Sequence, residues 1–489
     1  MNELARWQKV LFWLWLLLAV TGMVTQYAVT RYNGHWVVVA PLGTATTADF
    51  LESGLAGKGP VVFITRGVLD EVAHKLHQFP FVAPADVLVA VLFAIAVLLT
   101  LKNRQRVDWV AWPPLCLWAF LLAAGLSVLG AESMRNWLTE TAQLALYFFA
   151  GYWLAVNLLR RETEVRRTVV WLLGVSLLVL AFGLRDYWVH IYAAPLEREN
   201  PLWVRATFMS RTAFCGLLAL VLPLFLGFLL KAPTLGRKVA WAVPVGLALY
   251  PLLSLGALVA VGAALLLMAA REGWRTLLFT ALAVVVVAVL WVPFMSARQL
   301  DYLVDSVDFY DQAGEVTKRY LEWAATYNLL ADGHALFGVG AGENYQHTIG
   351  QYYYFLPNPE KMEPDTYNLY LIITAQMGFL GLWAWLYVLF DFLRRARRLE
   401  AAREPYYRGL SLGLWGSLVS VAVFSLFGTI LVRGTGLVLT LLLALIARVE
   451  RLAGKEEIAP PPAEEPLPPE EEGPPLPELE TERLDIETI

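Results

Sequence analysis

The sequence predicts an all-α polytopic membrane protein with about twelve transmembrane helices. Of its 489 residues, 58% are hydrophobic and only 16% are charged, whereas soluble domains average about 45–50% apolar and about 25% charged residues. The apolar residues also gather in runs that approach the roughly 20 residues needed to cross a bilayer as a helix. This composition excludes an ordinary soluble enzyme, a disordered chain and a disulfide-framed domain.

Twelve apolar runs predict the spans. The first is long enough to cross the membrane and lacks the small-residue cleavage site of a secretory signal. The seventh and eighth share the stretch Leu249 to Gly256, which predicts either one tight hairpin or a broken pair. The predicted spans are 10–29, 84–101, 108–130, 137–158, 167–188, 208–230, 238–253, 255–270, 275–295, 366–393, 408–429 and 434–449.

The basic residues predict the orientation, because Lys and Arg concentrate in cytoplasmic connections. Every second connection is basic, which places both termini in the cytoplasm. The residues concerned are Arg6, Lys9, Lys102, Arg104, Arg106, Arg160, Arg161, Arg166, Arg167, Lys231, Arg237, Lys238, Arg271, Arg275, Arg394, Arg395, Arg397, Arg398, Arg448 and Arg451.

The predicted organisation follows from these spans. Residues 1–295 hold nine helices with an external insertion at 30–83, residues 296–365 form a large periplasmic loop, and residues 366–450 hold the last three helices. Residues 451–489 are predicted to be a disordered cytoplasmic tail, since this Pro/Glu-rich segment has too few large apolar side chains to offset the entropy of ordering. The tail carries 12 acidic and 3 basic residues.

Motifs of soluble enzymes that bind nucleotides or metals are absent from the sequence. There is no Walker-type loop, no His-Glu-x-x-His and no Cys-x-x-Cys, and the six histidines have no metal-ligand spacing. The run Gly338-Val-Gly340-Ala-Gly342 follows no strand of a βαβ unit, so it predicts a tight turn before the chain re-enters the membrane. We therefore expect a site without metal or cofactor on the external side.

Charged residues near the outer ends of spans are the first candidates for a functional site. Ionisable groups near hydrocarbon cost free energy, so those that are present usually have a function. Arg205 and Arg211 are six residues apart and would share a helix face if the sixth span had already begun at Arg205. The alternative is that they snorkel to the interface. Arg319 and Glu322 have the i, i+3 spacing of a helix pair, and for Glu322 a surface salt bridge is the favoured interpretation.

The large loop supplies further candidates. His334 and His347 flank the glycine-rich run, and Asp365 precedes the tenth span, where it is either a general base or a helix cap. Aromatic residues of the loop are interpreted either as faces on which sugars stack or as groups that pack the loop onto the bilayer. They are Tyr302, Phe309, Tyr310, Tyr345, Tyr352, Tyr353, Tyr354 and Phe355.

Three motifs between Arg319 and Leu382 resemble the signature region of the O-antigen ligase and polymerase family. They occur in the family's order: Arg319-Tyr-Leu-Glu-Trp323, then Leu336-Phe-Gly338-Val-Gly340-Ala-Gly342, then Tyr367-Asn368-Leu369-Tyr370-Leu371 running into Gly378-Phe-Leu-Gly381. The large external loop before the antepenultimate span also agrees with this family. The motifs cover about a sixth of the chain.

Two departures from the family pattern concern the site. The family's histidine, assigned as the base that activates the acceptor hydroxyl, falls on Tyr367, and tyrosine with its ordinary pKa near 10 is a poor base at neutral pH. The family's Ser-Arg-Gly motif is Ser254-Leu255-Gly256 here, without its arginine. Asp365 or His347 is a candidate to replace the base, and Arg205 or Arg211 is a candidate to replace the arginine.

The resemblance implies transfer of a glycan from a polyprenyl (undecaprenyl) diphosphate carrier to an acceptor hydroxyl. This takes place on the periplasmic face of the bacterial inner membrane, without metal, nucleotide or nucleic acid. The acceptor is a glycan, a lipid or a protein. Arg319, Arg205 and Arg211 would bind the diphosphate, and Asp365, Tyr367, Asn368 and His347 would lie near the acceptor.

Other interpretations stay open. A chain polymerase shares these motifs with a ligase. A transporter of lipid-linked glycans would also need arginines, although it should show internal repeats that the sequence lacks. A non-catalytic scaffold is consistent with the loss of the histidine at Tyr367.

Overall fold

The computed structural model is mostly helical and describes much, but not all, of the chain. The ranges it describes are 7, 9–17, 28–32, 35–39, 61–64, 84–102, 112–193, 204–208, 210–291, 315–342, 344–353, 368–399, 404–431 and 434–458.

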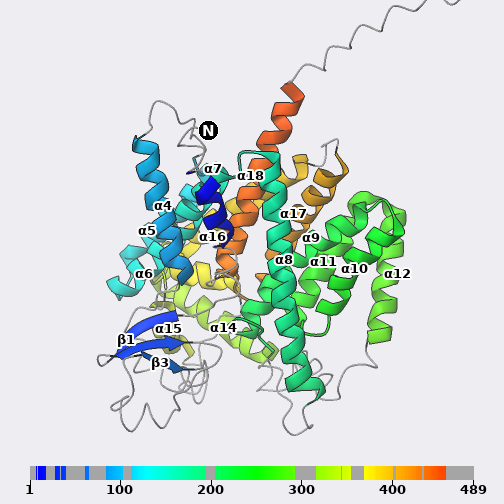
Figure 1. Cartoon of the computed structure of the whole chain (residues 1–489). Coiled ribbons are helices and arrows are strands. Elements are labelled where there is room, and N and C mark those ends of the chain that lie inside the picture. The colour runs from blue at the N-terminus through cyan, green and yellow to red at the C-terminus, as the bar shows by residue number, and fades with distance from the viewer. Residues whose placement is uncertain are drawn as a thin grey trace, which may run out of the picture.

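The helices of the described ranges form a bundle (Figure 1). Short π or 3₁₀ segments extend or join them at Ser127–Gly130, Leu146–Gly151, Trp188–Tyr192, Leu330–His334 and Gly350–Tyr353. The helices are α4 (Pro84–Lys102), α5 (Leu115–Leu126), α6 (Met134–Ala145), α7 (Tyr152–Leu158), α8 (Glu162–Tyr187), α9 (Arg211–Lys231), α10 (Leu235–Ala248), α11 (Leu255–Glu272), α12 (Trp274–Trp291), α14 (Glu315–Leu329), α15 (Asn344–Ile349), α16 (Leu369–Arg398), α17 (Pro405–Phe424) and α18 (Thr435–Ile458).

In the described ranges, seven of these helices are long and apolar enough to cross a membrane: α4, α8, α9, α11, α12, α16 and α17. The bounds of each helix lie within a few residues of those of a predicted span. The chain is therefore a multi-pass membrane protein. α5, α10 and α18 also coincide with predicted spans, but α5 and α10 are short, and α18 carries Arg448, Glu450 and Arg451 near its middle. The predicted count of twelve therefore stays a prediction.

A three-stranded sheet is the departure from the predicted all-helical fold (Figure 1). β1 (Ala28–Tyr32) pairs antiparallel with β2 (His35–Val39), which pairs parallel with β3 (Val61–Ile64). The sequence held a signal for it: Asn33-Gly34, a dipeptide typical of two-residue hairpin turns, stands between runs rich in β-branched and aromatic residues. The first predicted span, 10–29, is helical at 10–17, and its last two residues belong to β1 instead.

α9 is the central helix of the bundle, and every residue from Ala213 to Phe228 is buried. It packs closely on α17 through glycine: a Cβ on Gly227 would lie 2.4 Å from the carbonyl oxygen of Gly409 and 2.5 Å from the amide nitrogen of Gly413. Small residues four positions apart let two helix backbones approach in this way, as is common between membrane helices. The backbones of α9 and α17 are therefore in direct contact.

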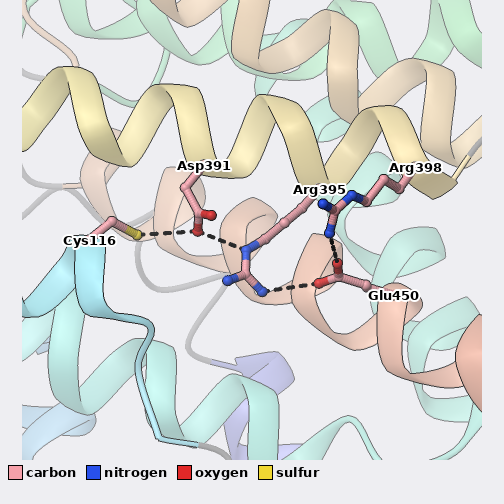
Figure 2. A network of polar contacts seen from close by, with 5 residues as sticks. All are labelled: Cys116, Asp391, Arg395, Arg398 and Glu450. Atoms are coloured by element: carbon pink, nitrogen blue, oxygen red, sulfur yellow. Dashed lines mark hydrogen bonds and ion pairs between the residues drawn. The ribbon is translucent and has the colours of Figure 1, made fainter.

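Ion pairs join the helices at one end of the bundle (Figure 2). Arg395 of α16 donates to Asp391 (2.7 Å) and to Glu450 of α18 (3.0 Å), and the thiol of Cys116 on α5 donates to the same Asp391 oxygen (3.5 Å). Arg398 lies 3.9 Å from Glu450. Arg395, Asp391 and Glu450 are each less than a third exposed, so each offsets part of the cost of removing its partner from water. The network holds α5, α16 and α18 together far from the first turn of α16.

Candidate functional site

The opposite end of the bundle is organised around the C-terminal end of α17. The first turn of α16 is bonded to it: the amide of Leu369 donates to the carbonyl of Ser425 (2.9 Å), and the hydroxyl of Tyr370 donates to the carbonyl of Ala422 (2.7 Å). Asn368 precedes this turn and is buried. Its Oδ1 accepts hydrogen bonds from the amides of Tyr370 (3.0 Å) and Leu371 (3.2 Å), which makes Asn368 the N-cap of α16.

The first turns of α9, α11 and α18 meet the same end of α17. A Cβ on Gly428 would lie 3.1 Å from Thr212 of α9, and one on Gly256 of α11 would lie 2.3 Å from the side chain of Phe427. A Cβ on Gly216 of α9 would touch both Phe424 (3.3 Å) and Thr435, the first residue of α18 (3.9 Å). Helix N-termini carry unpaired N–H groups and partial positive charge. The arrangement of α9, α11, α16 and α18 favours an anion at this end.

Arg205 and Arg211 lie at this end but not in one helix, so the condition under which they would share a helix face is not met. α9 begins at Arg211 because Ser210 caps it, accepting a hydrogen bond from the amide of Ala213 (3.1 Å). Arg205 belongs to a separate turn in which Ala206 has a left-handed φ of 52°. That turn is held to α8 by Asp186, which accepts from the amide of Ala206 (2.9 Å).

Arg319 lies in the second turn of α14, which packs beside the first turns of α16. Ala325 and Leu329 of α14 share one buried cluster with Ile372 and Ala375 of α16. The side chain of Arg319 is outside the described part. Glu322, interpreted from the sequence as part of a surface salt bridge, is only 4% exposed, because it lies on the buried face of α14.

The glycine-rich turn lies beside an interruption in α16. Gly338, Gly340 and Gly342 have φ values of 70°, 94° and 84°, and Gly378 in α16 has a φ of 67° and a ψ of −170°. Residues other than glycine rarely adopt such positive φ values. The sequence predicted the turn; the break in α16 is a finding of the structure.

The turn satisfies the backbone groups that the break in α16 leaves without helical partners. Such groups must find other partners inside a membrane protein, since unpaired backbone groups are costly there. Three backbone hydrogen bonds join turn and break: Val339 N to Ala375 O (2.9 Å), Gly340 N to Gln376 O (3.0 Å) and Phe379 N to Ala335 O (2.8 Å).

Residues distant in sequence hold the other side of the turn. The hydroxyl of Ser127 accepts from the amide of Ala341 (3.2 Å), and the side chain of Gln376 donates to the carbonyl of Gly342 (3.1 Å). A Cβ on Gly342 would lie 3.0 Å from the Cβ of Glu140, which places this carboxylate-bearing residue of α6 beside the turn. Sequence reasoning missed Ser127, Gln376 and Glu140, and no local motif marks them.

The loop aromatics divide into buried and outer residues. Tyr345 and Tyr353 are 2% and 0% exposed and pack in the cluster beneath α14, so they neither stack on sugars nor lie on the bilayer. Tyr352 donates to Asp332 (2.8 Å). Its partial burial, this hydrogen bond and the charge of Asp332 raise the pKa of Tyr352 to about 12, so it stays a donor at neutral pH. Tyr302, Phe309, Tyr310, Tyr354 and Phe355 lie outside the described residues.

The structure thus brings Asn368 and Arg211 to one end of α17 and places the helix of Arg319 beside them. His347 belongs to α15, but its side chain is not described, and Asp365 and Tyr367 lie outside the described residues. Their roles stay predictions. Within the described ranges, no three His, Cys, Asp or Glu side chains form a group that could hold a metal ion.

Asn368→Ala is expected to destabilise the protein by about 0.5–2 kcal/mol, because the two amide donors of α16 lose their acceptor. Asn368→Ser keeps a capping oxygen and should retain the thermal unfolding midpoint of the detergent-solubilised protein. If Asn368 also contacts a substrate, Asn368→Ser will lose activity while keeping stability. Equal stability of Asn368→Ala and the wild type would contradict the capping role.

One family model matches the chain: residues 239–386 match a model described as O-Antigen ligase. The match covers less than a third of the chain. It begins in α10, includes α11, α12, α14, α15 and the glycine-rich turn, and ends in α16 beyond its break. No curated protein matches significantly.

Proposed function

Because the chain carries an O-antigen ligase-like domain and is related to that family, we propose that it transfers a glycan from undecaprenyl diphosphate to an acceptor hydroxyl. The reaction takes place at the periplasmic face of the bacterial inner membrane. The observation that carries the proposal is the meeting of the first turns of α9, α11, α16 and α18 at one end of α17, with Arg211 and Asn368 among them and α14 alongside.

The proposed chemistry places positive charge where negative charge develops. The acceptor oxygen attacks the anomeric carbon of the first sugar, the bond from that carbon to the phosphate oxygen breaks, and the diphosphate leaves with the bonding electrons. Arg319, with Arg205 or Arg211, stabilises the departing diphosphate, since a guanidinium binds phosphate oxygens in a bidentate manner. Electrostatic stabilisation of this kind usually lowers the barrier more than any other single effect in an enzyme site.

The proton of the acceptor hydroxyl goes to a base near the first turn of α16. Asp365 is the leading candidate, because it precedes the cap residue Asn368 by only three positions. His347 is the second, and Tyr367 would serve only with a pKa far below its ordinary value near 10. We propose that neither a metal ion nor a nucleotide takes part.

The test uses the full chain in nanodiscs with an undecaprenyl-diphosphate-linked oligosaccharide. Release of undecaprenyl diphosphate is followed with no added metal or nucleotide, with and without candidate glycan, lipid and protein acceptors. Acceptor-dependent release is expected. A product that lengthens by repeated units identifies a polymerase, and a single transfer to lipid or protein identifies a ligase. Donor binding without release under any condition would refute the transferase and favour a transporter or scaffold.

A further inference from the structure

α14 presents an aromatic stripe on its outer face. Tyr320, Trp323 and Tyr327 are 69%, 50% and 72% exposed. Their spacing of three and four residues aligns them along one side of the helix, about 10 Å from the first to the last. We call these three residues the aromatic stripe. Each of these three aromatic rings exposes considerable apolar area, and contiguous exposed apolar area of this kind indicates a binding surface.

The opposite face of α14 fixes the stripe in place. Glu322, Ala325, Thr326 and Leu329 are each at most 4% exposed and turn toward the cluster that holds Tyr345 and Tyr353. α14 therefore cannot roll to bury the stripe without exposing its own packed face. The aromatic rings are displayed by a helix whose rotation is set by its core contacts.

The composition of the stripe differs from that of the exposed faces of α4 and α12, two of the helices long and apolar enough to cross a membrane, whereas α16 exposes aromatic side chains as well. α12 has no buried residue in its 18, and its exposed side chains are mostly aliphatic, among them Leu278, Leu282, Val285 and Val289. α4 likewise exposes Val87, Val91, Leu98 and Leu101. The stripe contains no aliphatic residue, and each of its side chains joins a flat apolar ring to a polar O–H or N–H group. Such groups suit a ligand that has both apolar C–H faces and hydroxyls.

We propose that the aromatic stripe is the surface on which the glycan of the lipid-linked donor stacks. This rests on the proposed function. The C–H faces of the sugar rings pack on the aromatic rings, and the Tyr hydroxyls and the Trp N–H bond to sugar hydroxyls. Arg319 immediately precedes Tyr320 in α14. A glycan attached to a diphosphate that is bound at Arg319 can therefore extend along α14 toward Tyr327. The stripe is long enough to contact more than one sugar ring.

The experiment compares two donors with the full chain in nanodiscs. One carries an oligosaccharide on undecaprenyl diphosphate, and the other carries a single N-acetylglucosamine. The double variant with Trp323→Ala and Tyr327→Ala is expected to raise the apparent KM for the oligosaccharide donor about tenfold, which corresponds to about 1.4 kcal/mol. Its kcat, and its KM for the single-sugar donor, should stay unchanged. Trp323→Tyr should restore most of the affinity. Unchanged KM values, or equal loss with both donors, would overturn the proposal.

A matched control comes from α8, whose extension carries the stacked pair Trp188 and Tyr192, with ring centroids 4.5 Å apart and exposures of 58% and 64%. Replacing both by alanine removes similar exposed aromatic area from a different helix and should leave both KM values unchanged. A rise equal to that of the stripe variant would mean that loss of exposed aromatic area anywhere has this effect, which would overturn the proposal.

A second measurement does not depend on turnover. Cys116 and Cys215 are both 0% exposed, so a cysteine introduced as Tyr327→Cys should be the reactive thiol of the solubilised chain. It should react with a membrane-impermeant maleimide in nanodiscs, and the oligosaccharide donor should slow that reaction more than the single-sugar donor. Reaction only with a lipid-soluble maleimide would place the stripe in the bilayer interface and overturn the proposal. Protection without any transfer would retain glycan stacking while refuting the transferase.

Discussion

Gly378→Ala is expected to prevent stable folding of the junction between α16 and the glycine-rich turn. Gly378 has a φ of 67°, which costs an L-residue roughly 1–2 kcal/mol. A Cβ there would lie 2.1 Å from the carbonyl oxygen of Leu336, and relieving such an overlap costs about 1–3 kcal/mol more. Shifting the backbone to relieve it would also break the hydrogen bonds that the turn makes to Ala375 and Gln376.

The measurement is the yield of monodisperse protein and its thermal unfolding midpoint. Alanine variants of three other glycines separate the cost of a positive φ from the cost of a steric overlap. Gly333 has a φ of 97° with open space around it, Gly130 has ordinary φ but a Cβ 2.0 Å from Gly338 O, and Gly350 has neither problem. We expect Gly350→Ala to change the yield and the unfolding midpoint very little. The alanine variants of Gly333 and Gly130 should lower both by an intermediate amount, and Gly378→Ala should lower them most. A Gly378→Ala protein as stable as Gly350→Ala would show that the junction tolerates displacement.

Arg319→Ala is expected to lower kcat for release of undecaprenyl diphosphate by about 10²–10³-fold, the usual loss when one preorganised donor to developing negative charge is removed. Protein yield and unfolding midpoint should change little, since α14 is anchored by the buried Ala325 and Leu329. Arg319→Lys should recover only part of the rate, because an ammonium is a point charge that cannot bind two phosphate oxygens side by side.

The matched control for Arg319→Ala is Arg185→Ala. Arg185 lies in the last turn of α8, its side chain is 72% exposed, and its salt bridge to Asp186 is 3.8 Å long. A pair with one exposed partner and so long a separation contributes about 0–1 kcal/mol, so Arg185→Ala should retain the wild-type rate and stability. If both variants lose activity equally, general loss of positive charge is the cause, and Arg319 has no specific role.

Much of the helical framework could be predicted from hydropathy alone. The predicted spans 84–101, 255–270 and 408–429 correspond to α4, α11 and α17, because burial in a bilayer requires long continuous apolar runs and little else. The sheet escaped prediction because its strands have only four or five residues, a length at which hydropathy does not distinguish strand from helix.

The candidate site divides differently. The glycine-rich turn could be predicted from its motif, since backbone positions with positive φ favour glycine. Motifs also singled out Arg319 and Asn368, whose roles in a reaction stay predictions. The capping role of Asn368 could not be predicted, and neither could the separation of Arg205 from α9, because both depend on which backbone groups lie nearby after folding. The aromatic stripe was missed because exposure depends on which face of α14 the core covers.

Local apolar runs and short motifs are enough to identify this chain as a multi-pass membrane protein with an O-antigen ligase-like region. The interruption of α16 at Gly378 is different, because it depends on how distant parts of the chain pack together. The freed carbonyls of α16 are bonded by the turn at Val339 and Gly340, and Ser127, more than 200 residues away in the chain, holds that turn. A buried backbone group needs a partner somewhere, but only the packing of helices decides which residue supplies it.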